Sequence, residues 1–245
     1  MRKKIILMMI PLLLLTGCKD KNDELFNKQE NIVKEELKNS ENITEQTIRS
    51  KYEFLKNNYD SYNKSEKEEI IYSAKFLQTI GNKNNNQLTS LADLMLVYVK
   101  DGSKENYEKL KIMFKNVESN ENRLISELYN SYLIENKVKK IITEKQEKVK
   151  ADLKDKKLLT SKYLKEGINY IEKNIDEPFK NSEVTENLVY FSMLFDGLSK
   201  KGNVKTLGNK TITYLKTLDE TKHQEIKTLL SKMNKDKDIS KVLGK

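Results

Sequence analysis

Apolar residues recur three or four positions apart along most of the chain. The runs at 48–59, 88–99, 164–175 and 184–198 follow this spacing closely, with polar residues between the apolar ones. This spacing places the apolar side chains on one face of an α-helix. The sequence has no pair of alternating apolar and polar runs joined by a two-residue turn, which would indicate a β-hairpin. The pattern therefore predicts an all-α fold.

The predicted architecture is an irregular multi-helix bundle or an array of helical hairpins, with about eight to ten helices. One helix is unusually long, because residues 121–157 contain neither glycine nor proline. Its second half has a thin apolar face, since Lys145 and Gln146 stand where another apolar residue is expected. This half could project from the body or pair with a partner. The other predicted helices cover 25–37, 48–59, 65–80, 88–99, 103–117, 164–175, 184–198, 204–218 and 223–233.

The body of the chain reads as one helical domain at 25–233. The clearest loop is the glycine- and asparagine-rich segment at 81–87, which is either a flexible connection or a modest domain seam. Residues 234–245 are rich in charge, and we expect them to form a C-terminal tail.

The first residues follow a different pattern. Arg2, Lys3 and Lys4 precede eleven uncharged residues at 5–15, and small residues follow before Cys18. This order is typical of an export signal. The apolar run is shorter than the roughly 20 residues that a membrane-spanning helix needs. We therefore expect residues 1–17 to be a cleaved signal peptide.

The stretch Leu15-Thr16-Gly17-Cys18 resembles the lipobox of bacterial lipoproteins. The resemblance implies cleavage between Gly17 and Cys18, a diacylglycerol on the Cys18 sulfur and, at most, one further acyl chain on its amine. Residues 18–24 would then be the lipidated cysteine and a short tether. Two or three acyl chains hold a protein firmly on a bilayer. The expected location is the cell envelope, on the cell membrane or the outer membrane, with the membrane contacted through the lipid.

The charge balance does not point to nucleic acid. The chain has 46 Lys and Arg against 37 Asp and Glu, but only three of the basic residues are arginines. Nucleic-acid surfaces gather cationic and aromatic side chains, whereas these lysines alternate with acidic residues as on a solvated helix face. We therefore expect no nucleic-acid partner.

One stretch is more basic than the rest, with eleven lysines and four acidic residues at 137–165. It could contact anionic lipid headgroups or an acidic glycan, or it could be an exposed face of a long helix. Tyr59 and Tyr62, beside a polar turn, are further candidates for a contact surface. The lysines of the basic contact stretch are Lys137, Lys139, Lys140, Lys145, Lys148, Lys150, Lys154, Lys156 and Lys157.

The sequence offers few residues for the familiar catalytic mechanisms. Cys18 is the single cysteine and His223 is the single histidine, which we expect on the surface of the last helix. Neither a zinc-binding pattern nor a glycine-rich phosphate loop occurs. The sequence therefore nominates no catalytic residue, no metal ligand and no cofactor beyond the lipid.

These observations predict a non-enzymatic binding module anchored in the envelope, contacting host or environmental macromolecules such as a protein or an acidic glycan. The alternative is a periplasm-facing accessory or scaffold subunit of an envelope complex, docking through the helix at 121–157. An enzyme without familiar motifs is a third reading. The sequence leaves the oligomeric state open.

Overall fold

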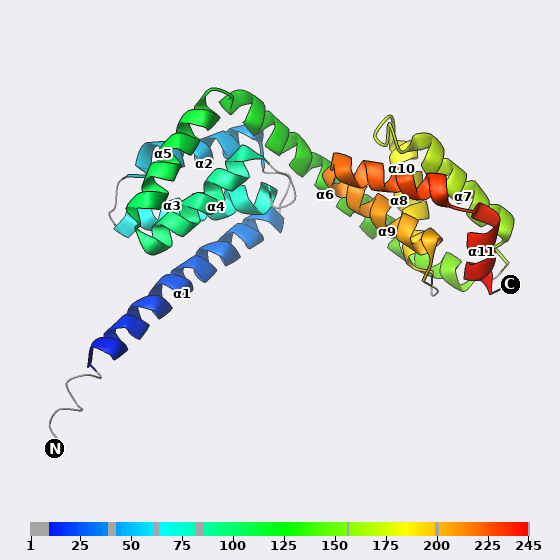
Figure 1. The fold of residues 1–245 in the computed structure, drawn as a ribbon, viewed down its shortest axis with the longest axis horizontal. Helices are drawn as coiled ribbons and strands as arrows, with labels where there is room; N and C mark the ends of the chain where they lie inside the picture. Colours follow the sequence, from blue (N-terminus) through cyan, green and yellow to red (C-terminus); the bar gives the residue numbers. More distant parts are fainter. Residues whose placement is uncertain are drawn as a thin grey trace, which may run out of the picture. The chain divides into compact units, whose positions relative to one another are not determined.

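The computed structural model describes residues 10–38, 43–60, 64–81, 86–155, 157–198 and 201–244, with side chains from 23 onward except those of 64 and 65. All regular structure in these ranges is helical, which confirms the all-α prediction (Figure 1). There are eleven helices in them: α1 (Ile10–Lys38), α2 (Glu45–Asn58), α3 (Lys64–Gly81), α4 (Gln87–Asp101), α5 (Lys104–Glu118), α6 (Glu121–Lys154), α7 (Ser161–Asn174), α8 (Ser182–Asp196), α9 (Asn203–Thr217), α10 (Glu220–Lys232) and α11 (Lys235–Leu243).

The chain divides into two compact units within α6. The first unit is Met1–Asn130 and the second is Ser131–Lys245, so α6 contributes one part to each. Residues 82–85 of the predicted seam lie outside the described residues. The helices on either side, α3 and α4, pack against each other inside the first unit, where Gln78 donates a hydrogen bond to Asp93. The predicted domain at 25–233 is therefore two units, and the division falls at 130/131.

The first unit is built around the apolar faces of α2, α3 and α4. Its fully buried side chains include Tyr52, Phe76, Ile48, Leu55, Leu77, Leu88 and Leu91. α1 packs on α3, and Phe26 and Val33 are the buried apolar residues of its described side chains. Burial of these side chains removes apolar surface from water, which is the main force that holds the helices together.

Gly102 and Ser103 form the turn between α4 and α5. Gly102 adopts the left-handed conformation with φ 61°, which glycine tolerates, and its N–H donates to the Tyr98 carbonyl. Ser103 caps α5 by accepting a hydrogen bond from the Asn106 N–H at 3.3 Å. The two helices pack against each other as a helical hairpin.

The predicted long helix is present as α6, which is 34 residues long and ends at Lys154 rather than at 157. Asp155 follows it, and its carboxylate accepts a hydrogen bond from the Lys157 N–H at 2.8 Å. This local hydrogen bond competes with continuation of the helix and favours a turn.

The second unit has a separate core between α6, α7, α8, α9 and α10. α8 and α9 approach each other closely at Gly208, which faces the backbone of α8. A Cβ atom at Gly208 would lie 2.5 Å from the Asp196 nitrogen and 2.5 Å from the Ser192 carbonyl oxygen. The helices can approach this far because glycine has no side chain there. The fully buried apolar residues of this core include Leu164, Ile168, Ile171, Leu188, Leu194, Phe195, Leu207 and Leu215.

The predicted charged tail at 234–245 is instead a packed helix. Asn234 caps α11 by accepting a hydrogen bond from the Lys237 N–H, and Ile239 is 1% exposed. Lys235 pairs with Glu172 on α7 at 2.6 Å. The segment looked like a tail because half of its residues are charged. Its single fully buried isoleucine and its two pairs with α7 were not visible in the local pattern.

Candidate interaction surfaces

The residues of the predicted lipid site lie in α1. Gly17, Cys18 and the segment 18–24 fall within its range Ile10–Lys38, whereas residues 1–9 lie outside the described residues. The side chain of Cys18 is also outside the described part of the chain. Cleavage and lipidation at this position therefore stay predictions.

The predicted basic contact stretch lies on the second half of α6 and just beyond it. Six of its lysines are exposed on α6, at 137, 139, 140, 148, 150 and 154, and Lys157 is exposed after it. Lys145 is partly buried and pairs with Glu186 on α8 at 2.5 Å. Lys156 is outside the described residues.

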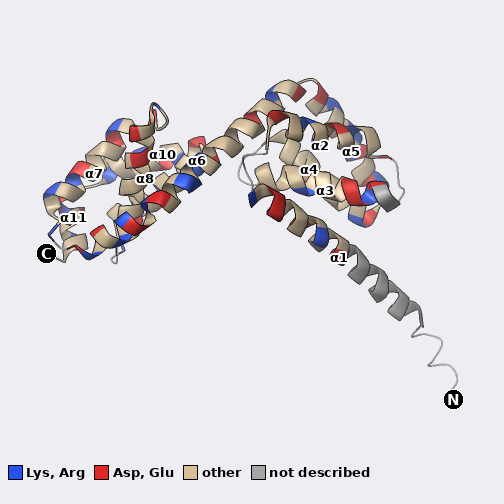
Figure 2. Ribbon diagram, turned by 180° about the vertical axis from the view of Figure 1, so that it is seen from behind, with Lys and Arg blue, Asp and Glu red and all other residues tan. Residues whose placement is uncertain are grey.

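Several of these lysines form ion pairs with acidic side chains or lie over an aromatic ring. Lys139 pairs with Glu135 at 3.0 Å and Lys150 pairs with Glu147 at 2.7 Å, both one turn away on the same helix. Lys148 lies over the ring of Tyr190, 4.8 Å from its centroid. Figure 2 shows the same alternation of blue and red segments along the other helices. The stretch is therefore a mixed helix face that is rich in lysine.

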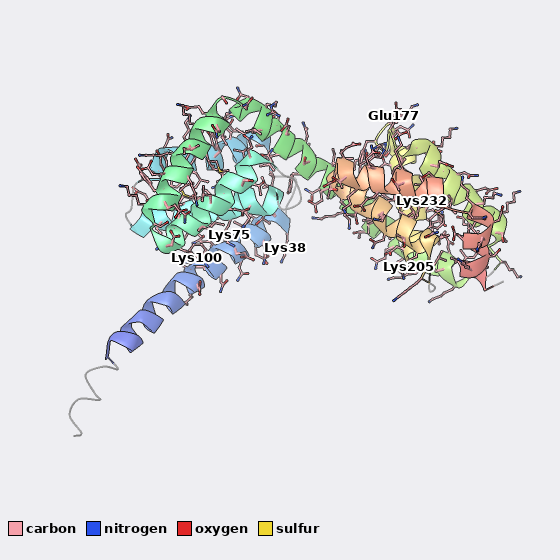
Figure 3. All side chains as sticks on the ribbon, in the orientation of Figure 1. Lys38, Lys75, Lys100, Glu177, Lys205 and Lys232 are labelled. Carbon is pink, nitrogen blue, oxygen red and sulfur yellow. The ribbon has the colours of Figure 1, made fainter. Side chains whose placement is uncertain are left out.

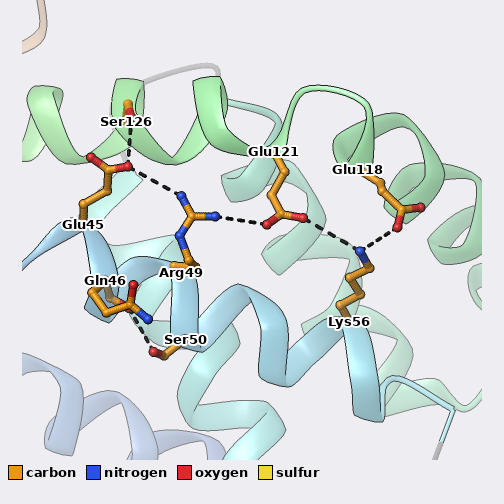
Figure 4. Close-up of polar contacts among 8 residues, drawn as sticks. All are labelled: Glu45, Gln46, Arg49, Ser50, Lys56, Glu118, Glu121 and Ser126. Carbon is orange, nitrogen blue, oxygen red and sulfur yellow. Dashed lines mark hydrogen bonds and ion pairs between the residues drawn. The ribbon is translucent and has the colours of Figure 1, made fainter.

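A charge network that sequence reasoning missed links α2 to the turn between α5 and α6 (Figure 4). Arg49 contacts Glu121 at 3.2 Å and Glu45 at 3.6 Å. Lys56 contacts Glu118 at 2.6 Å and Glu121 at 3.8 Å. The hydrogen bond that Lys56 donates to Glu118 raises the pKa of Lys56 above its ordinary value. Apart from Arg49 and Glu45, which are neighbours on α2, these pairs join residues 62 to 72 positions apart, so no local pattern could have shown them.

A polar hollow of about 370 Å³ lies at the same turn, lined by Glu118, Ser119, Asn120, Glu121, Asn122 and Arg123. The Glu121 side chain is 20% exposed and is already bound to Arg49. The polar lining of the hollow can therefore offer hydrogen bonds and charge to a partner.

The predicted contact residue Tyr59 lies within an aromatic cluster of the first unit. Its ring stacks on Tyr107 with centroids 5.9 Å apart and lies 4.7 Å from Phe114. Tyr107 also contacts Tyr98, and Lys111 lies over the Tyr107 ring at 4.6 Å. Tyr59 therefore helps to pack α2 against α5, while Tyr62 is outside the described residues.

His223 is not the surface residue that we predicted, because its side chain is only 11% exposed. Its ring stacks on Tyr214 at 5.0 Å, with 16° between the planes. Nε2 lies 2.8 Å from Asp176 and Nδ1 lies 3.4 Å from Glu220. Hydrogen bonds from Lys227 and then His223 lower the pKa of Asp176.

The contacts of His223 have a structural role, because they connect α10 to the loop between α7 and α8. Both ring nitrogens face carboxylates, so neither is directed at a hydroxyl or thiol nucleophile. Asp176 belongs to the loop between α7 and α8, and the contact fixes this loop to α10. His223 lies on α10, which is not the last helix as predicted, because α11 follows it.

A network of tyrosine hydroxyl groups and a carboxylate lies in the second unit. Tyr190 donates a hydrogen bond to Asp152 at 2.6 Å, and the Tyr163 and Tyr190 hydroxyl oxygens are 2.8 Å apart. Burial, followed by the bond to Asp152, raises the pKa of Tyr190. The network joins α6, α7 and α8.

Comparisons with known proteins give no match: no family model fits the chain, and neither a curated protein nor a solved structure is similar to it. Among the residues that the structure describes, no three histidine, cysteine, aspartate or glutamate side chains are grouped to hold a metal ion. Over the same residues, no helix combines the length and the apolar character required to cross a bilayer.

Proposed function

We propose that the protein is an exported, lipid-anchored protein of the bacterial cell envelope that acts by binding rather than by catalysis. The observation that carries the proposal is Leu15-Thr16-Gly17-Cys18, which follows a basic segment and an apolar segment and contains the single cysteine. The lipid would hold the two helical units at the membrane surface.

The partner would be a protein or an acidic glycan outside the cell. The lysine-rich face of α6 and the polar hollow at 118–123 are the surfaces that support this part of the proposal. Lys140 and Lys154 are exposed on α6, where an acidic polymer could reach them. Such contacts would weaken as salt is added, because exposed charges are screened.

A second candidate is an accessory or scaffold subunit that faces the periplasm. The continuous helix α6 favours it, because Leu133 on this helix keeps 42% of its surface exposed and could take part in a helix-to-helix contact. Treating intact cells with protease separates the two candidates. Rapid loss of the protein beside a protected periplasmic control supports the surface location, and protection until the envelope is opened supports the periplasmic one.

The lipid anchor is tested by the substitution Cys18→Ser. We expect the variant to lose incorporation of a tagged fatty acid and to leave the membrane fraction, because the acyl chains supply the membrane affinity. Ile112→Ala is the control, since this side chain is 63% exposed in the body of the first unit and should not affect anchoring. Unchanged processing and equal membrane retention in the serine variant would defeat the proposal.

A further inference from the structure

One end of the first unit is fixed to the part of α1 that follows the lipid site. Lys100, near the end of α4, pairs with Asp23 at 3.2 Å. Its ammonium also lies 4.7 Å from the ring centroid of Phe26, a side chain that is 5% exposed. Figure 3 labels Lys100, which lies beside α1. The part of α1 that carries Asp23 and Phe26 is thus held against the C-terminal end of α4.

The chain between the lipid site and this end is short. Asp23 follows Cys18 by five residues. Five residues reach at most about 18 Å when fully extended, and about 7.5 Å when helical. In either conformation, a lipid on Cys18 keeps Asp23 within about 18 Å of the membrane surface.

α5 starts at this end of the unit and leads away from it. It begins at Lys104, directly after the turn at Gly102, and its 15 residues span about 21 Å. At its other end, Glu118 is bound to Lys56 of α2. The turn between α5 and α6, with its polar hollow, is therefore the end of α5 that lies farther from Asp23. Figure 1 shows this turn on the side of the first unit away from α1.

We propose that the first unit rests on the headgroup layer of the membrane that holds Cys18, through the turn between α4 and α5. The turn between α5 and α6 then points away from the membrane and is presented to a partner. This orientation rests on the lipid anchor proposed above. The charges at the contact are mixed, with Lys100 and Lys104 beside Asp101 and Glu105, so the short link rather than lipid charge sets the orientation.

Two lysines of α5 provide a matched pair of probe positions. Lys104 and Lys115 are both exposed, and eleven residues separate them. Eleven residues amount to just over three full helical turns, so the two side chains share a face of α5 about 16 Å apart along its axis. In the lipidated chain the sulfur of Cys18 is occupied, so a cysteine introduced at either position is the single reactive thiol.

The experiment uses full-length lipidated Lys104→Cys and Lys115→Cys, each labelled with a thiol-reactive fluorophore. Both are placed in phosphatidylcholine vesicles that carry a short-range nitroxide quencher on the headgroup. We expect the label at position 104 to lose more than half of its emission and the label at position 115 to keep most of it. Equal quenching, or stronger quenching at 115, overturns the orientation.

Sedimentation with the vesicles separates this outcome from a failure of the anchor. If the protein does not sediment with vesicles and carries no acyl chains, the anchor and the orientation are both wrong. If it sediments with them and the two labels are quenched equally, the anchor stands and the orientation alone is wrong.

Discussion

Leu218 holds a backbone conformation that is unfavourable for its side chain. Its φ is 49°, in the left-handed region, and it has the only positive φ of a residue other than glycine in the described ranges. It closes α9, where its N–H donates to the Tyr214 carbonyl at 2.7 Å. This position usually carries glycine, because a Cβ atom there costs about 1–2 kcal/mol.

The substitution Leu218→Gly should therefore stabilise the second unit by about 1 kcal/mol. The gain from relieved backbone strain exceeds the loss of packing, since the side chain is already 39% exposed. The urea midpoint should rise with an unchanged slope.

Gly102→Ala is the opposite control. Its φ is 61°, and nothing lies within 4 Å of the added Cβ atom, so strain alone should lower stability by about 1 kcal/mol. No change in either variant would show that the left-handed conformation costs little in this chain.

Residue environments were the least predictable part of the molecule. The sequence singled out His223 because it is the sole histidine, but its contact with Asp176 joins residues 47 positions apart. The same holds for Arg49 and Glu121, which are 72 positions apart. Long-range ion pairs leave no periodic trace, so burial and partners of charged residues had to come from the structure.

At the scale of elements, the helices were predictable where apolar spacing and end signals agreed. α4 and α5 are flanked by Gly102 and Ser103, and both were placed within a few residues. α11 was missed because its apolar residues, Ile239, Val242 and Leu243, are few and stand among charged ones. The division at 130/131 was missed because an uninterrupted helix, rather than a loop, connects the two units.

An ion pair between α1 and α3 depends on the ionised form of Glu30. Its carboxylate contacts Lys34 on the same helix at 2.6 Å and Lys75 on α3 at 2.8 Å. These hydrogen bonds, that from Lys34 first, lower the pKa of Glu30 from 4.5 to about 2. A depressed pKa in the folded state contributes stability above pH 4.5, and this contribution is lost as the pH falls towards 2.

We expect Glu30→Gln to lower stability at pH 7 by about 1 kcal/mol, since the partly exposed pair is screened by solvent. The variant should also lose less stability than the unchanged chain between pH 4.5 and pH 2. Urea unfolding at several pH values measures both effects. Glu35→Gln is the control, because Glu35 contacts Lys38 on α1 itself. Parallel pH profiles for Glu30→Gln and the unchanged chain would contradict the assignment.

At the scale of the molecule, each unit has its own hydrophobic core. Separate cores allow separate unfolding, because a local defect removes contacts from one core and leaves the other intact. Gly208 offers a way to weaken the second core alone, since its neighbours are backbone atoms that cannot move aside.

Gly208→Ala should destabilise the second unit by about 1–2 kcal/mol, as overpacking outweighs the gain in helix propensity. Hydrogen exchange should then quicken in α8 and α9 and stay unchanged in α3 and α4. Asn209→Ala, at an exposed neighbouring position on α9, is the control. Equal loss of protection in both units would show that they unfold together.

The buried tyrosines give the folded chain a distinctive ultraviolet behaviour. The chain has twelve tyrosines and no tryptophan, so its near-ultraviolet absorption comes mainly from phenol rings. Burial raises the pKa of Tyr52, Tyr190 and Tyr214. Phenols of this kind stabilise the fold at neutral pH and oppose it once alkali begins to ionise them. In strong base, phenolate absorption at these rings thus marks the loss of structure, so one optical signal follows both the chemistry and the unfolding.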